Sequence, residues 1–149
     1  MPTPFESAQL NLKLFELRQD PLLREARAWF FVEFNPESFA ELATIASGEK
    51  NSWFRMVLGY WDMAASLVTS GAIDGDAFRA AHSEVFVTFA KVSPYIEELR
   101  ARAGEPHFCK HLEAVVTAAP NYETILNTRR AMAAAVAKRR RESESSKTV

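Results

Sequence analysis

The run from Trp53 to Val68 constrains the fold most, because a helix built from it would be apolar nearly all round. In a protein that dissolves in water, such a helix has to be surrounded by other helices. We therefore expect a buried helix over about residues 52–70 at the centre of an irregular all-α bundle of about six to eight helices. Gly59 costs about 1 kcal/mol relative to alanine inside a helix, which predicts the close approach of a second helix. The polar exceptions in the run are Arg55, Asp62 and Ser66.

Signals for helix starts recur along the chain, and strand signals are nearly absent. Asp20-Pro21 and Asn35-Pro36 each put a capping side chain before a proline at the first helical position, where the missing N–H is no loss. The β-prone run at residues 85–89 lies inside a longer helical period, and the chain holds only five glycines. The first expected helix, residues 5–18, is a dense apolar run without one clean face.

The composition predicts one domain. Hydrophobic residues make up 48% of the 149-residue chain, which is enough for a single core. We expect a helical domain over residues 1–141 that includes a basic C-terminal helix. Residues 142–149 are expected to form a disordered tail, because they cannot bury enough apolar surface. No apolar run approaches the roughly 18 residues of a membrane span. The lone Cys109 and the lack of a signal peptide predict a cytoplasmic protein.

Charge is distributed unevenly along the chain. Up to Leu126 there are 11 basic and 17 acidic residues, whereas from Asn127 onward there are 7 basic and 2 acidic residues. The basic end could contact phosphates or an anionic surface, remain a solvated helix, or dock on an acidic body, its own or a partner's. Aromatic residues for base stacking are lacking there, so we do not expect nucleic acid to be the main partner. The candidate contacts are Arg129, Arg130, Lys138, Arg139, Arg140 and Arg141.

A candidate ligand pocket is predicted at Arg55, Tyr60 and Asp62. Arg55 and Asp62 lie two helical turns apart and therefore near one face. A carboxylate in apolar surroundings can act as an acid, a base or an anchor for a ligand. The structural alternative is an ion pair, or a hydrogen bond from Asp62 to a neighbouring backbone or to the hydroxyl of Tyr60 or Tyr95, because a buried carboxylate needs partners in either case.

His107 and His111 are the candidate metal ligands, since two histidines four residues apart share a helix face. Cys109 would point roughly the opposite way, and Phe108 stands where a zinc-protease helix carries its glutamate. We therefore predict no metal site, no cofactor and no catalytic residue. His107 and His111 are retained as the positions to inspect.

The segment from Leu58 to Asp74, followed by Val92 to Arg100, resembles a bacterial family of uncharacterised helical proteins. The shared pattern is an aromatic pair before an acidic residue, an aliphatic helix, a glycine and an Ile-Asp turn, followed by a helix that ends in an Ile-x-x-x-Arg-like segment. The resemblance covers roughly Leu22 to Arg102. It implies an all-helical fold and carries no assigned activity and no site residues.

Three readings of the function follow from these patterns. The first is a non-enzymatic interaction or regulatory module that engages a protein partner, or a second copy, through a helix groove or the basic tail. The alternative is a ligand-binding or catalytic bundle with a pocket near Asp62. Weak nucleic-acid binding through the basic C-terminal helix is the third reading.

Overall fold

The computed structural model describes residues 1–149 and contains helices without any strand. The all-α bundle predicted from the sequence is confirmed. In chain order the elements are α1 (Pro4–Leu17), α2 (Pro21–Val32), α3 (Phe39–Ser47), α4 (Asn51–Thr69), α5 (Gly75–Ala81), α6 (Glu84–Val92), the 3-10 turn η1 (Ser93–Tyr95), α7 (Ile96–Ala103), α8 (Lys110–Thr117) and α9 (Tyr122–Lys147). None of the helices combines the length and the hydrophobicity that a membrane crossing requires.

Local capping explains several helix starts. The Asp20 carboxylate accepts hydrogen bonds from the backbone N–H groups of Leu22 and Leu23 and so opens α2. The helix start predicted at Asn35-Pro36 is wrong. Helix α3 begins three residues after Pro36 and is capped by Ser38, whose hydroxyl accepts from the backbone of Glu41. The side chain of Asn35 is engaged elsewhere, as described below.

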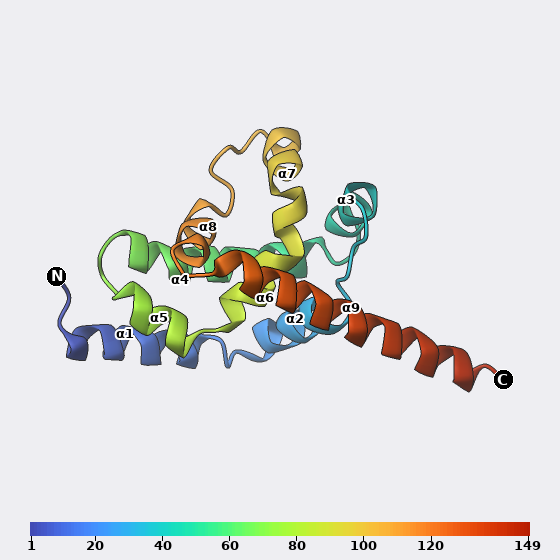
Figure 1. The fold of residues 1–149 in the computed structure, drawn as a ribbon, viewed down its shortest axis with the longest axis horizontal. Coiled ribbons are helices and arrows are strands. Elements are labelled where there is room, and N and C mark those ends of the chain that lie inside the picture. The colour runs from blue at the N-terminus through green and yellow to red at the C-terminus, as the bar shows by residue number, and fades with distance from the viewer.

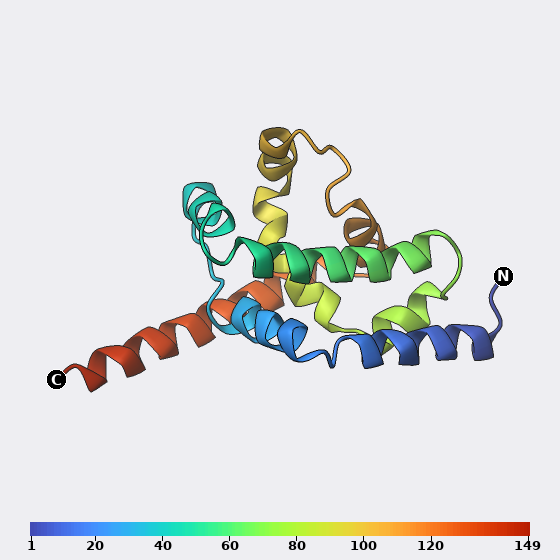
Figure 2. The same ribbon diagram turned by 180° about the vertical axis from the view of Figure 1, so that it is seen from behind.

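The bundle is arranged around α4 and α6. Helix α4 packs most extensively against α8 and α2, and α6 packs most extensively against α9. Helices α1 and α2 follow one long side of the molecule, and the two termini lie at opposite ends of its longest axis (Figures 1 and 2). The core includes the rings of Phe30 and Phe34, stacked with 4.8 Å between centroids. It also includes the fully buried Trp61.

One flank of α4 is open to solvent. Phe54, Leu58 and Trp61 are buried, but Ser52, Arg55, Gly59 and Met63 are exposed, and their spacing puts these four on one stripe. No atom lies within 4 Å of the place where a Cβ on Gly59 would stand. The expectations that helices surround α4 on all sides and that a helix approaches Gly59 closely are therefore wrong. Three of the four residues on this stripe, Ser52, Arg55 and Gly59, are small or polar, which allows it to face water.

The C-terminal helix is longer than predicted. Helix α9 continues to Lys147, so residues 142–147 are helical where the sequence predicted a disordered tail from 142 onward. No glycine or proline interrupts this stretch, and Arg140 donates to the Glu144 carboxylate at 3.0 Å across one turn. Residues 142–149 are all exposed. The last turns project beyond the bundle (Figure 1).

Candidate functional site

The three residues of the predicted Asp62 pocket do not converge. Asp62 Oδ1 accepts the backbone N–H of Leu112 at 2.9 Å, which satisfies the first turn of α8. The Tyr60 hydroxyl donates to the carbonyl of Leu14 on α1, and burial raises the pKa of Tyr60 to about 12. Arg55 is exposed. Arg55 and Asp62 do line a groove of about 950 Å³ between α4 and the α7–α8 connection, whereas Tyr60 faces α1.

The two candidate metal ligands do not share a helix. Helix α8 starts only at Lys110, because Cys109 adopts a left-handed conformation with φ 56° and His107 lies in the turn before it. His111 Nδ1 lies 2.7 Å from the Thr69 hydroxyl. No group of three or more histidine, cysteine or acidic side chains is placed to hold a metal ion. Burial raises the pKa of the Cys109 thiol to about 12.

The basic residues of α9 are divided among different tasks. Arg130 donates to the carbonyl of Ala90 and to the Ser93 hydroxyl. Arg140 lies 3.7 Å from a carboxylate oxygen of Glu33, the residue that follows α2, so it forms an exposed ion pair with the body of the same chain. The remaining candidates are Arg141, which lines a small cavity, and Arg129, Lys138 and Arg139, which form no ion pair within the chain.

The buried ammonium of Lys91 caps the C-terminus of α2. Lys91 on α6 is only 7% exposed. Its Nζ lies 2.7, 2.9 and 3.0 Å from the carbonyl oxygens of Phe30, Phe31 and Phe34, and 3.1 Å from Asn35 Oδ1. Burial lowers the pKa of Lys91 to about 8, so the ammonium is charged at pH 7. A cation at this position complements the orphan carbonyls and the dipole of α2.

The most apolar exposed surface lies on α1. The inner face of this helix packs through Ser7 and Leu14, which are buried. On the outer face, Phe5 and Leu12 are each 69% exposed and Phe15 is 50% exposed. Their spacing puts the three on one stripe. The dense apolar run noted in the sequence was the signal for this arrangement, because a helix with apolar residues on two faces can bury only one of them against its own bundle.

The outer stripe borders a groove of about 630 Å³ between α1 and α5. Leu12 and Phe15 form one side of the groove and Ala77 and Ala81 line it from α5. Its polar lining consists of Ser7, Asn11, Asp74 and His82. Figure 1 shows α1 and α5 running alongside each other at the N-terminal end of the molecule. We call the outer stripe together with this groove the α1 surface.

His82 and Ser7 are the buried polar residues of this groove, and His82 is the titratable one. It is 1% exposed, its Nε2 lies 3.1 Å from Asn11 Oδ1, and its Nδ1 has no hydrogen-bond partner. Burial, reinforced by the charge of Arg18, lowers the pKa of His82 to about 4. The imidazole is therefore neutral at pH 7. Because Asn11 Oδ1 accepts, Nε2 carries the proton and Nδ1 keeps a bare lone pair.

An ion network next to His82 holds four elements together. The Arg27 guanidinium on α2 binds the Glu84 carboxylate on α6 through two hydrogen bonds of 2.7 and 2.6 Å. Arg18, which follows α1, lies 3.5 Å from the same carboxylate, and the Trp61 indole N–H on α4 donates to it at 3.3 Å. A bidentate pair of this kind fixes orientation as well as distance. The network ties the end of α1 to α2, α4 and α6.

One family model matches most of the chain. A family model described as Domain of unknown function (DUF4760) matches residues 4–119. The match spans α1 to α8 and includes the Leu22–Arg102 segment whose resemblance was noted in the sequence, whereas α9 follows it. No curated protein matches the chain, and no solved structure matches it. The chain belongs to the DUF4760 family of domains of unknown function.

Proposed function

We propose that this protein is a non-enzymatic binding module whose α1 surface receives an amphipathic helix of a partner protein. The observation that carries the proposal is the exposure of Phe5, Leu12 and Phe15 along one helix beside an apolar groove. Exposed apolar patches of this kind mark interaction sites in soluble proteins. A partner helix with apolar residues at positions i, i+3, i+4 and i+7 would match such a groove.

The energetics favour a modest affinity. Burial of a whole leucine or phenylalanine side chain stabilises by roughly 1.5–3 kcal/mol. Because Leu12 and Phe15 are already partly covered, we expect each to contribute about 1–2 kcal/mol on binding. Arg18 lies over the Phe15 ring at 4.8 Å from the centroid and holds that ring in place. Because the Phe15 side chain is already held in place, binding costs less of its conformational entropy.

The groove chemistry supports binding rather than catalysis. His82 is neutral, and its Nδ1 has no exposed surface. The Ser7 hydroxyl accepts the backbone N–H of Asp74 at 3.2 Å, and the Asp74 carboxylate caps α5. These groups are committed to holding α1 against α5. The free thiol of Cys109 is buried, which supports a location in a reducing compartment. The same proposal therefore places the module in the cytoplasm. It also includes a bacterial origin, which the family resemblance implies.

Affinity capture with matched baits tests the proposal. The wild-type chain, Leu12→Lys and Phe15→Lys are immobilised and incubated with a lysate of the source cells, and bound proteins are quantified. Met132→Lys serves as the control, because Met132 is similarly exposed on α9. We expect one protein to be retained by the wild type and the control and lost from both α1 variants. The captured protein is then purified and its dissociation constant measured against all four chains.

The outcome that contradicts the proposal is a set of bound proteins that does not differ among the four baits. Sedimentation velocity of the wild-type chain identifies the remaining alternative. A dimer that Leu12→Lys abolishes would mean that the occupant of the α1 surface is a second copy and not another protein.

A further inference from the structure

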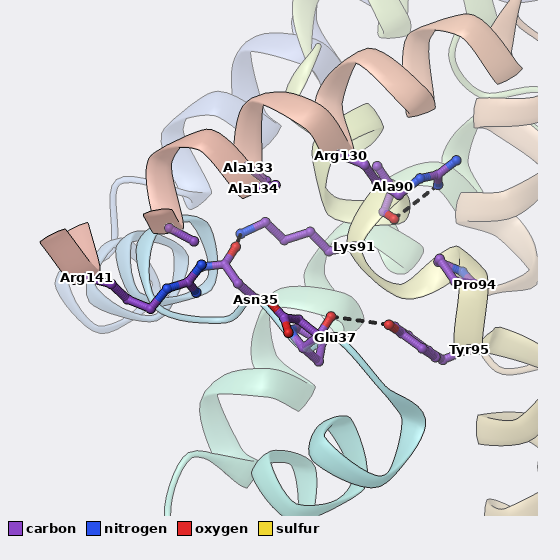
Figure 3. A pocket seen from close by; sticks show the side chains of 12 residues that line it. Asn35, Glu37, Ala90, Lys91, Pro94, Tyr95, Arg130, Ala133, Ala134 and Arg141 are labelled. Atoms are coloured by element: carbon purple, nitrogen blue, oxygen red, sulfur yellow. Dashed lines mark hydrogen bonds between the residues drawn. The ribbon is translucent and has the colours of Figure 1, made fainter. Parts of the chain in front are cut away.

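A small cavity lies between α9, the α2–α3 loop, the end of α6 and η1 (Figure 3). Its volume is about 170 Å³. Lys91, Arg130 and Arg141 line it together with Asn35 and Tyr95. The α9 wall between the two arginines consists of alanines, whose short side chains leave the space open. The cavity lies at a different place from the α1 surface and shares no residue with it.

The three cations that line this cavity have no carboxylate partner. The ammonium of Lys91 meets carbonyl and amide oxygens, and Arg130 meets a carbonyl, a hydroxyl and an amide. Arg141 forms neither a hydrogen bond nor an ion pair, although Figure 3 shows its side chain reaching toward Asn35. Four other buried or half-buried arginines, Arg18, Arg27, Arg79 and Arg100, each lie within 4 Å of a carboxylate.

Three cations without a carboxylate partner line a partly enclosed space and give it a positive potential. Glu37 is the one carboxylate among the lining residues, and it forms no ion pair with them. The lining therefore carries two more positive than negative charges. Lys91 is buried and Arg130 is half-buried, so their charges are screened less than charges at an open surface, whereas Arg141 is exposed at the rim of the cavity. The potential would attract an anion, and the free guanidinium fork of Arg141 can bind a carboxylate through two hydrogen bonds.

We propose that this cavity binds a small organic carboxylate whose anionic group pairs with Arg141 and whose short apolar part lies against the alanines of α9. The volume is below the roughly 300–1,000 Å³ of pockets for drug-sized ligands, which limits the ligand to a few carbon atoms. Ala133, Ala134 and Ala137 supply the apolar wall, opposite Pro94 and Tyr95. Lys91 contributes charge and not a hydrogen bond, because its three protons already face four oxygens. The ligand would lie between α9 and the segments of the body that line the other side of the cavity.

Isothermal titration calorimetry of the full chain with sodium butyrate tests this proposal, against sodium chloride at equal ionic strength. We expect saturable binding of butyrate and none of chloride. Arg141→Gln should weaken butyrate binding about tenfold, since a charge-assisted hydrogen bond is lost. Arg139→Gln, which alters an exposed charge on the same helix that does not line the cavity, should leave binding unchanged.

Two further measurements keep the assignment falsifiable. Ala134→Leu fills the cavity from an exposed position of α9 and should abolish butyrate binding without loss of helix content by circular dichroism. Inorganic phosphate, which has no apolar part, should bind more weakly than butyrate. The proposal is overturned by heats that match the chloride control, by equal binding to the Arg139 and Arg141 variants, or by phosphate binding as tightly as butyrate.

Discussion

Replacement of Lys91 by methionine tests whether the buried ammonium stabilises the fold. Methionine has a similar length and volume but no N–H donor, so the change removes the hydrogen bonds and leaves the apolar packing. The three carbonyl oxygens at the end of α2 and the Asn35 amide oxygen would then lose their donor. Buried acceptors without a partner are costly.

The magnitude can be worked out from the contacts. An ammonium has three protons, and hydrogen bonds from a charged donor contribute about 1.5–3 kcal/mol each, which gives about 4.5–9 kcal/mol. Burial works in the opposite direction. It lowers the pKa of Lys91 from 10.5 to about 8, which corresponds to a cost of about 3 kcal/mol for the charged form. The difference, about 1.5–6 kcal/mol, predicts that Lys91→Met lowers the free energy of unfolding by an amount centred at about 3 kcal/mol.

Urea unfolding at pH 7, followed by tryptophan fluorescence and far-UV circular dichroism, measures this loss. For a chain of this length, about 3 kcal/mol also lowers the melting temperature by roughly 6–12 °C. Lys13→Met is the matched control, because the Lys13 side chain is 59% exposed; its effect should stay within about 0.5 kcal/mol. A loss for Lys91→Met no larger than that of the control would refute the reasoning.

Four further outcomes are expected. Gly59→Ala should raise the free energy of unfolding by about 1 kcal/mol, because the site is exposed and helical and has no atom near the added methyl group; a loss in urea unfolding would show a contact that we have missed. Glu84→Gln should cost about 3–5 kcal/mol by the same assay, since it leaves Arg27 without its counter-charge. The pKa of His82 is about 4 in the folded state and 6.5 in the unfolded state, so the unfolded chain binds more protons between these pH values. The free energy of unfolding therefore falls by up to about 3 kcal/mol as the pH drops from 6.5 to 4. His82→Gln should flatten this part of the pH profile in urea titrations. Leu12→Lys should change the melting temperature by less than about 2 °C, whereas a larger fall would mean that the residue supports the fold and not a partner.

Much of the fold could be predicted from the sequence because the signals are local. The cap at Asp20 and the proline after it act within one turn, so the start of α2 follows from neighbouring residues alone. The apolar run from Trp53 to Val68 likewise predicted a helix, and α4 spans it. The resemblance to an uncharacterised family rested on contiguous residues and was confirmed by the match over residues 4–119.

The candidate sites depended on contacts between distant segments, which no local pattern encodes. Lys91 binds oxygens of residues 56 to 61 positions earlier in the chain. Asp62 looked like a pocket residue in the sequence, yet it caps a helix that lies 50 positions later. In both cases the sequence shows a charged side chain among apolar residues. Which group that side chain contacts depends on which helices pack together.

The sequence by itself determined that the chain forms helices and where most of them begin, because capping, periodicity and composition act over a few residues. Its family could also be assigned from the sequence, through the match over residues 4–119. Only the tertiary structure decided which apolar faces remain uncovered. A helix such as α1 or α4 has apolar residues on more than one side, and the number and placement of its neighbours determine which side meets water. The α1 surface and the open flank of α4 are both consequences of that packing.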